Sequence, residues 1–127
     1  MLFRSELPSR VVICQLDVAP LVAPRPSTPA PVIPRLPAIG RDIALVVPAE
    51  VPAGSVGEAV RTAGGALVEA VTLFDVYRGD PIPAGHVSLA YAVVLRDPDR
   101  TLTDEDADAV MRAIGSAVAA AGWTVRE

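Results

Sequence analysis

The chain has 127 residues, 51% of them hydrophobic, which is enough apolar material for one folded domain and too much for a disordered protein. Residues 38–127 carry thirteen acids against seven arginines, and this excess argues against a general nucleic-acid binder with a basic face. No apolar run approaches the ~20 residues of a membrane-spanning helix, the first ten residues do not resemble a secretory signal, and Cys14 is the single cysteine. We therefore expect a cytoplasmic protein with no membrane contact and no internal disulfide.

The N-terminal part of the chain divides into two stretches. The sequence "RVVICQLDV" (residues 10–18) is typical of a strand, but a lone strand has no partner on which to bury its apolar side. We interpret residues 1–19 as the end of a preceding, larger domain. Residues 20–37 then contain seven prolines, so residues 20–38 are predicted to form an extended linker that is neither helix nor central strand.

Clear periodicities begin after the linker. Residues 41–48 read as a buried strand, and the apolar spacing of residues 56–63 predicts a helix that Gly64 and Gly65 end. Residues 67–79 and 87–97 predict two long strands joined by the hairpin "DPIPAG". Thr103 and Asp106 form a capping box for a second helix that ends at Gly122, and "WTVRE" predicts a last short strand.

The element order is therefore β-α-β-β-α-β over residues 39–127. With right-handed crossovers, this order predicts an α+β ferredoxin-like fold, in which a four-stranded antiparallel sheet carries both helices on one face.

Alternation along the strands predicts which side chains the helices cover. Ile43, Leu45 and Val47 are expected in the core with the odd-numbered residues 87–95, and Phe74 and Val76 are expected to point toward the helices. The uncovered face of the sheet is then predicted to carry Asp42, Ala44, Val46, Leu73, Asp75, Tyr77, Ser88, Ala90, Ala92, Val94 and Arg96. Such a flat face suits a planar base or another protein surface better than a small substrate, although it could equally face water or a neighbouring domain.

Other polar residues indicate no catalytic or metal site. His86 is expected to be a solvated turn residue, and one His with one Cys gives no metal-binding signature. The acids at positions 104–108 fit the first turn of a helix, where the dipole favours negative charge. Arg41 and Arg78 are expected to pair with Asp42, Asp75 or Asp80 rather than to contact nucleic acid, and Arg100 could brace its loop or meet a phosphate.

Several segments in this order resemble one known family. They are "GRDIALVVPAEVP", the stretch from "VTLFDVYRGD" through "SLA" and "RTLTDE", and the closing "GWTVRE". Residues 39–127 resemble the ferredoxin-fold anticodon-binding domain at the C-terminus of bacterial phenylalanyl-tRNA synthetase beta subunits. Residues 7–22 resemble the end of the inactive synthetase-like domain that precedes it, which would account for the isolated strand.

The resemblance implies a non-catalytic module that binds the anticodon stem-loop of tRNA(Phe) during aminoacylation. Its partners would be the rest of the beta subunit and the alpha subunit in an alpha2-beta2 tetramer, which uses ATP and Mg²⁺, whereas no cofactor is expected on this chain. The candidate tRNA-binding residues are Asp42, Asp75, Tyr77, Ser88, Ala90, Arg96 and Arg100. The alternative is a ferredoxin-like module that senses a small ligand near "PAEVPAGS" or docks a protein.

Overall fold

The computed structural model describes residues 12, 14–23 and 33–126. The chain divides into two units, residues 1–32 and 33–127, and each is considered by itself. Within the described residues, no helix combines the length and the apolar character needed to cross a bilayer.

The first unit differs from its prediction in two ways. Residues 12 and 14–18 carry no strand, and Val12 is 94% exposed. A strand needs a partner to pair with, and no described residue pairs with this segment. Residues 10, 11 and 13 of the expected strand lie outside the described residues. A four-residue helix, α1, spans Ala19–Val22. The prediction that residues 20–22 could not be helical was wrong, since Pro20 occupies the first turn, where a missing N–H costs no hydrogen bond.

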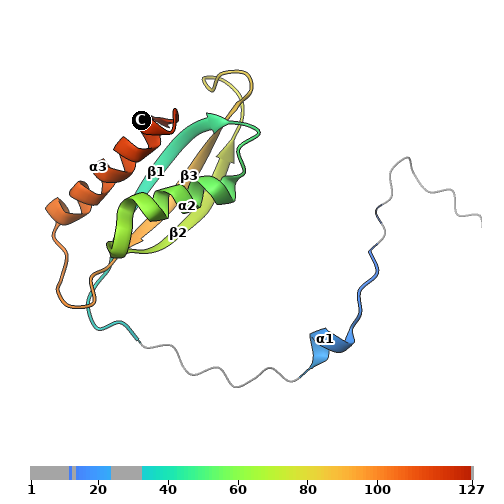
Figure 1. The fold of residues 1–127 in the computed structure, drawn as a ribbon, viewed down its shortest axis with the longest axis horizontal. Coiled ribbons are helices and arrows are strands. Elements are labelled where there is room, and N and C mark those ends of the chain that lie inside the picture. The colour runs from blue at the N-terminus through green and yellow to red at the C-terminus, as the bar shows by residue number, and fades with distance from the viewer. Residues whose placement is uncertain (1–11, 13, 24–32, 127) are drawn as a thin grey trace, which may run out of the picture. The chain divides into compact units, whose positions relative to one another are not determined.

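The second unit has the predicted element order (Figure 1). Its elements are β1 (Ile39–Pro48), α2 (Ala53–Gly64), the short 3₁₀ turn η1 (Gly65–Leu67), β2 (Val68–Tyr77), β3 (His86–Leu95), α3 (Asp104–Ala120) and β4 (Thr124–Arg126). The strands form one antiparallel sheet in the order β2-β3-β1-β4. This arrangement confirms the ferredoxin-like α+β fold.

A single core lies between the sheet and the two helices. β1 contributes Ile43, Leu45 and Val47, and β3 contributes the odd-numbered residues 87–95, all buried as alternation predicted. Val56 and Val60 of α2, and Ala107, Ile114 and Val118 of α3, pack against them. Neither α2 nor α3 covers the opposite face of the sheet, which we call the open face.

The two helices end and begin as the sequence predicts. α2 stops at Gly64, and Gly65 follows with a φ of 67°, a conformation that favours glycine. α3 begins with the capping box: the Thr103 hydroxyl accepts from the Asp106 N–H, and the Asp106 carboxylate accepts from the Thr103 N–H.

Strand β2 departs from simple alternation. Leu73 pairs with Tyr91 and Asp75 pairs with Ala90, so Phe74 is an extra residue in a β-bulge. Leu73 therefore shares the helix-covered side with Tyr91, and its predicted place on the open face was wrong. Phe74 is 58% exposed and has no pairing position of its own, so the register does not test its predicted orientation toward the helices. Val76 does pair with the core residue Leu89, as expected, although it is 42% exposed.

Candidate nucleic-acid interface

Strand register aligns the polar residues of the open face in rows that cross the sheet. Asp75, Ala90, Ala44 and Arg126 form one row, and Tyr77, Ser88, Val46 and Thr124 form the next. Asp42 pairs with Ala92 in a third row. The structure thus brings together five of the seven predicted site residues, Asp42, Asp75, Tyr77, Ser88 and Ala90.

Arg126 belongs to this group and was missed by the sequence analysis. It lies on the edge strand β4, yet its Nη1 donates to Ser88 Oγ at 3.3 Å, and its Cζ lies 5.6 Å from the centre of the Tyr77 ring. A guanidinium at this distance from an aromatic face makes a cation–π contact. The side chain can reach two strands away because the positions that it crosses, Ala44 and Ala90, are small.

The turn after β2 fixes Tyr77. Its hydroxyl donates to the backbone oxygen of Asp80 at 2.8 Å. Gly79 has a φ of 126°, and a Cβ at that position would lie only 3.4 Å from the Tyr77 hydroxyl. The ring is held from its polar end while the residue remains 40% exposed, so the turn presents an aromatic surface that is both fixed and accessible.

The carboxylates of the open face are hydrogen-bond acceptors. Asp75 Oδ1 accepts from the Val76 N–H at 2.9 Å, which leaves its other oxygen available, and Asp42 is exposed on β1. Ionised carboxylates accept hydrogen bonds from base amino and imino groups but repel phosphates. The chemistry of this face therefore favours the base side of a nucleic acid over its backbone.

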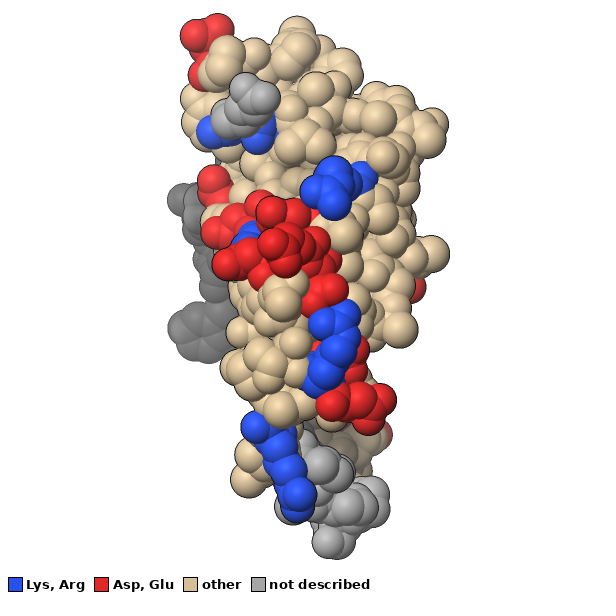
Figure 2. All heavy atoms as spheres, turned by 90° about the vertical axis from the view of Figure 1, so that its left-hand side faces the viewer, with Lys and Arg blue, Asp and Glu red and all other residues tan. Residues whose placement is uncertain are grey.

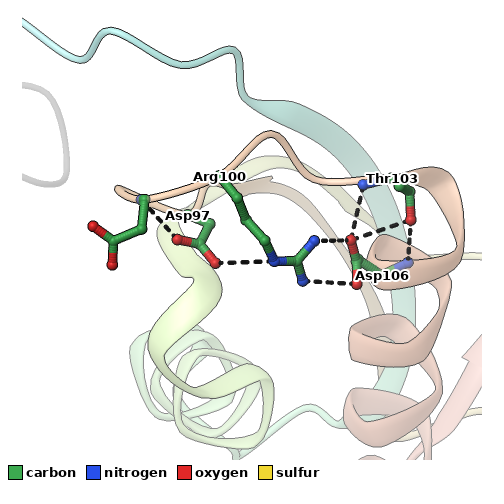
Figure 3. A network of polar contacts seen from close by, with 5 residues as sticks. Asp97, Arg100, Thr103 and Asp106 are labelled. Carbon is green, nitrogen blue, oxygen red and sulfur yellow. Dashed lines mark hydrogen bonds and ion pairs between the residues drawn. The ribbon is translucent and has the colours of Figure 1, made fainter.

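The other two predicted site residues are engaged elsewhere. Arg96 follows β3, where its Nε donates to Glu69 at 2.9 Å and its Nη1 donates to the Leu36 carbonyl. Arg100 lies in the loop before α3, and its guanidinium donates to both carboxylate oxygens of Asp106 at 2.6 and 2.9 Å (Figure 3). These contacts tie the ends of the strands and of α3 to neighbouring segments.

The Arg100 network also changes the acidity of its partner. The hydrogen bonds from Arg100, and then from the Thr103 N–H, hold the pKa of the Asp106 carboxyl well below its usual range. Asp97 adds a second carboxylate 3.6 Å from Arg100 Nε. The loop between β3 and α3 is therefore held by charge at both of its ends.

Arg41, Arg78 and His86, which the sequence analysis placed outside the site, lie in different surroundings. Arg41 pairs with Asp104 at 2.6 Å and Asp108 at 3.8 Å, so an ion pair was predicted correctly but with the wrong acids. Figure 2 views the side on which α3 lies and shows a central group of acidic side chains with basic ones above and below it. Arg78 makes no ion pair with any described residue, and His86 is exposed at the start of β3, its Nδ1 3.3 Å from the Ala84 oxygen.

The segment considered for small-ligand sensing lies beside two open hollows. One, of about 650 Å³, is lined by residues of α2 and by Ala117; the other, of about 360 Å³, lies between α2 and β2. Within the described part of the chain, no buried side-chain polar atom lacks a hydrogen-bond partner, and no group of three or more His, Cys, Asp or Glu is arranged to hold a metal ion.

Comparison with known proteins gives one family and many similar sequences. Residues 34–126 match the family model described as "Ferredoxin-fold anticodon binding domain". The phenylalanine–tRNA ligase beta subunit of Symbiobacterium thermophilum is 44% identical over 97% of this chain, and that of Moorella thermoacetica is 47% identical over 89%. The beta subunit of Anaeromyxobacter dehalogenans is 58% identical over 61% of this chain.

The chain is much shorter than these relatives. The alignment spans 14% of the length of the Symbiobacterium and Moorella proteins and 9% of the Anaeromyxobacter protein. The similarity therefore concerns one module of a large subunit.

Proposed function

The chain belongs to the ferredoxin-fold anticodon binding domain family, and on this basis we propose that it binds the anticodon stem-loop of a phenylalanine tRNA. It would do so as part of a phenylalanine–tRNA ligase beta subunit, by means of the open face. The role is one of binding and orientation, and no bond is made or broken by these residues.

The observation that carries this proposal is the cluster of Tyr77, Ser88 and Arg126. RNA-binding sheets recognise unpaired bases by stacking them on exposed aromatic rings or guanidinium planes. Tyr77 and Arg126 supply one of each, already in contact, and the turn at Gly79 and Asp80 restrains the ring. A base would therefore find a preorganised surface, which lowers the entropy cost of binding.

The acids on the same face support recognition of base edges. Asp42 and Asp75 can accept hydrogen bonds from base N–H groups, while their charge disfavours phosphates close to the sheet. We infer that the bases of the loop face the sheet and that its backbone lies outward.

The wider setting is proposed from the similar proteins. We infer that the chain acts with the remainder of a beta subunit and with alpha subunits in an alpha2-beta2 enzyme of the cytoplasm. In that enzyme ATP and Mg²⁺ would be used by other parts, and this module would hold the tRNA while the amino acid is transferred.

The experiment is a titration of the full 127-residue chain with two RNA stem-loops, one carrying the phenylalanine anticodon and one a different anticodon. We expect tighter binding of the first. Tyr77→Ala should weaken it roughly 5- to 150-fold, the range for loss of one stacked base. Val125→Ala is the matched control, because Val125 is also exposed but pairs with the core residue Leu45.

Two outcomes would overturn the proposal. One is equal affinity for the two stem-loops. The other is a Tyr77→Ala variant that keeps its fold, measured by circular dichroism, and binds the cognate stem-loop as well as the unchanged chain does.

A further inference from the structure

Phe74 is a large apolar side chain that the fold leaves exposed beside the proposed site. It is 58% exposed, more than Leu73, Val76 or Tyr77 on the same strand. Burying an aromatic ring is strongly favourable in water, so a ring that stays exposed needs an explanation. The cause is the bulge, which inserts Phe74 between the pairs Leu73–Tyr91 and Asp75–Ala90.

The bulge also determines which residues lie next to Phe74. Asp75, which follows Phe74 directly, pairs with Ala90, a residue of the open face, whereas Leu73 lines the hollow between α2 and β2 with Tyr91. Phe74 is not among the residues that line that hollow. Along the strand, Phe74 is followed by Asp75, and Tyr77 comes two residues after Asp75.

The spacing of the two rings suits bases that are separated from one another. Asp75, which follows Phe74, and Tyr77 pair with Ala90 and Ser88, which are two residues apart on β3, or about 7 Å. The two rings therefore start from backbone positions at least this far apart. Bases stacked on each other in a helix lie only about 3.4 Å apart. Two bases that each met one ring would have to be splayed, as single-stranded RNA is when a protein reads it.

We propose that Phe74 stacks a second unpaired base, adjacent in the RNA to the base that Tyr77 stacks, with the Asp75 carboxylate between them as an acceptor for their edges. The inference rests on the proposed function and extends it from one base to two. It identifies the ligand as two consecutive nucleotides of a single-stranded loop.

This assignment is tested by removing the RNA bases and the aromatic side chains separately and then together. The full chain and its Phe74→Ala and Tyr77→Ala variants are titrated with stem-loops in which one anticodon position at a time is abasic, so that the base is lost and its phosphate is kept. In the unchanged chain, removing either stacked base should weaken binding roughly 5- to 150-fold. Phe74→Ala should bind equally well with and without the base that Phe74 stacks. Tyr77→Ala should bind equally well with and without the adjacent base, which Tyr77 stacks.

Three further variants serve as controls. Val76→Ala shortens an exposed apolar residue of the same strand that pairs with the core residue Leu89, and it should leave RNA binding unchanged. Phe74→Tyr keeps an aromatic face and should bind like the unchanged chain. Phe74→Leu keeps apolar area without the ring and should bind as weakly as Phe74→Ala.

The outcomes separate this inference from the function on which it rests. If Tyr77→Ala weakens binding but Phe74→Ala does not, the second base is overturned and the anticodon proposal stands. Binding by Phe74→Leu equal to that of the unchanged chain would show that the RNA needs only an apolar surface and no aromatic ring, and would also overturn the inference. If the unchanged chain binds neither stem-loop, both proposals fall.

Discussion

Gly64 closes α2 against the start of β2, and its missing side chain makes that closure possible. A methyl group there would overlap Cγ2 of Val68 and lie 3.2 Å from Ile114 Cδ1 and 3.3 Å from Val110 Cγ1. We expect Gly64→Ala to lower the free energy of unfolding by about 1–3 kcal/mol, the usual cost of overpacking a core. Urea denaturation of the full chain measures this change.

Gly115 supplies the matched control for Gly64→Ala. It lies inside α3, and a Cβ there would meet nothing within 4 Å. Gly115→Ala should raise the free energy of unfolding by up to about 1 kcal/mol, because alanine loses less backbone freedom in a helix than glycine does. Equal stability of both variants would show that the Val68 side chain moves aside at little cost.

Tyr91 is buried in the core, whereas Tyr77 is exposed and is the residue proposed to bind RNA. The Tyr91 ring is buried, and its hydroxyl donates to the Ala53 carbonyl at 2.7 Å, which joins β3 to the start of α2. Burial raises the pKa of the Tyr91 hydroxyl. Tyr91→Phe should cost about 1 kcal/mol of unfolding free energy, the value of one hydrogen bond, and should leave binding of the stem-loop unchanged. A loss of RNA binding without a loss of stability would contradict this division.

At the scale of the element, the start of α3 depends on one carboxylate. Asp106 accepts from Arg100 and from Thr103, and its pKa is lowered by both. A carboxyl whose pKa is lower in the folded state stabilises that state above its unfolded pKa of about 3.9 and stops doing so as pH falls through the folded value. We therefore expect the free energy of unfolding to fall as the pH is lowered below about 5, and to fall less steeply in Asp106→Asn.

Arg100→Gln tests whether the ion pair is the cause. It removes the largest contribution to the lowered pKa of Asp106 and should flatten the acid dependence, but less than Asp106→Asn does, because the Thr103 hydrogen bonds remain. The double variant should be no flatter than Asp106→Asn alone, because without the Asp106 carboxylate the Arg100 side chain has nothing left to act on there. Additive effects on the pH dependence would assign the acid sensitivity to other groups.

Strand β2 shows where prediction from sequence reached its limit. Alternation gave the correct buried face for β1 and β3, because those strands pair residue by residue over their whole length. In β2 the same rule misplaced Leu73, since the bulge adds one residue and reverses the faces on one side of it. Nothing in "TLFDV" distinguishes an inserted residue from a regular one, so only the pairing with β3 reveals it.

At the scale of the whole molecule, the element order of residues 39–126, the end of α2 and the start of α3 were predictable because capping, glycine stops and periodicity are local signals. Arg126 was not, since its role depends on the register of β4 against β1 and on the small residues that lie between it and Tyr77. The structure engages Arg96 and Arg100 in ion pairs, which sequence position alone could not show. Contacts across several strands are a property of the assembled sheet.

The charge distribution of the whole molecule leads to the last prediction. Three arginines of residues 38–127 are paired with carboxylates, namely Arg41, Arg96 and Arg100. Arg126 contacts Tyr77 on the open face. Each phosphate neutralised on a single strand contributes about −0.7 to the slope of log K against log salt. With bases facing the sheet, we expect the affinity for the stem-loop to fall with a slope between about 0 and −1.5, which is shallow for an RNA-binding domain.

Titrations at several salt concentrations measure that slope, and two variants assign it. Tyr77→Ala should reduce affinity at every salt concentration without changing the slope, because it removes stacking and no charge. Arg126→Gln should bring the slope closer to zero by up to about 0.7, because it removes one cation. A slope steeper than about −2.8 would correspond to four or more phosphate contacts. That result would mean that the backbone of the RNA meets other basic residues of the chain, and that the base-first orientation is wrong.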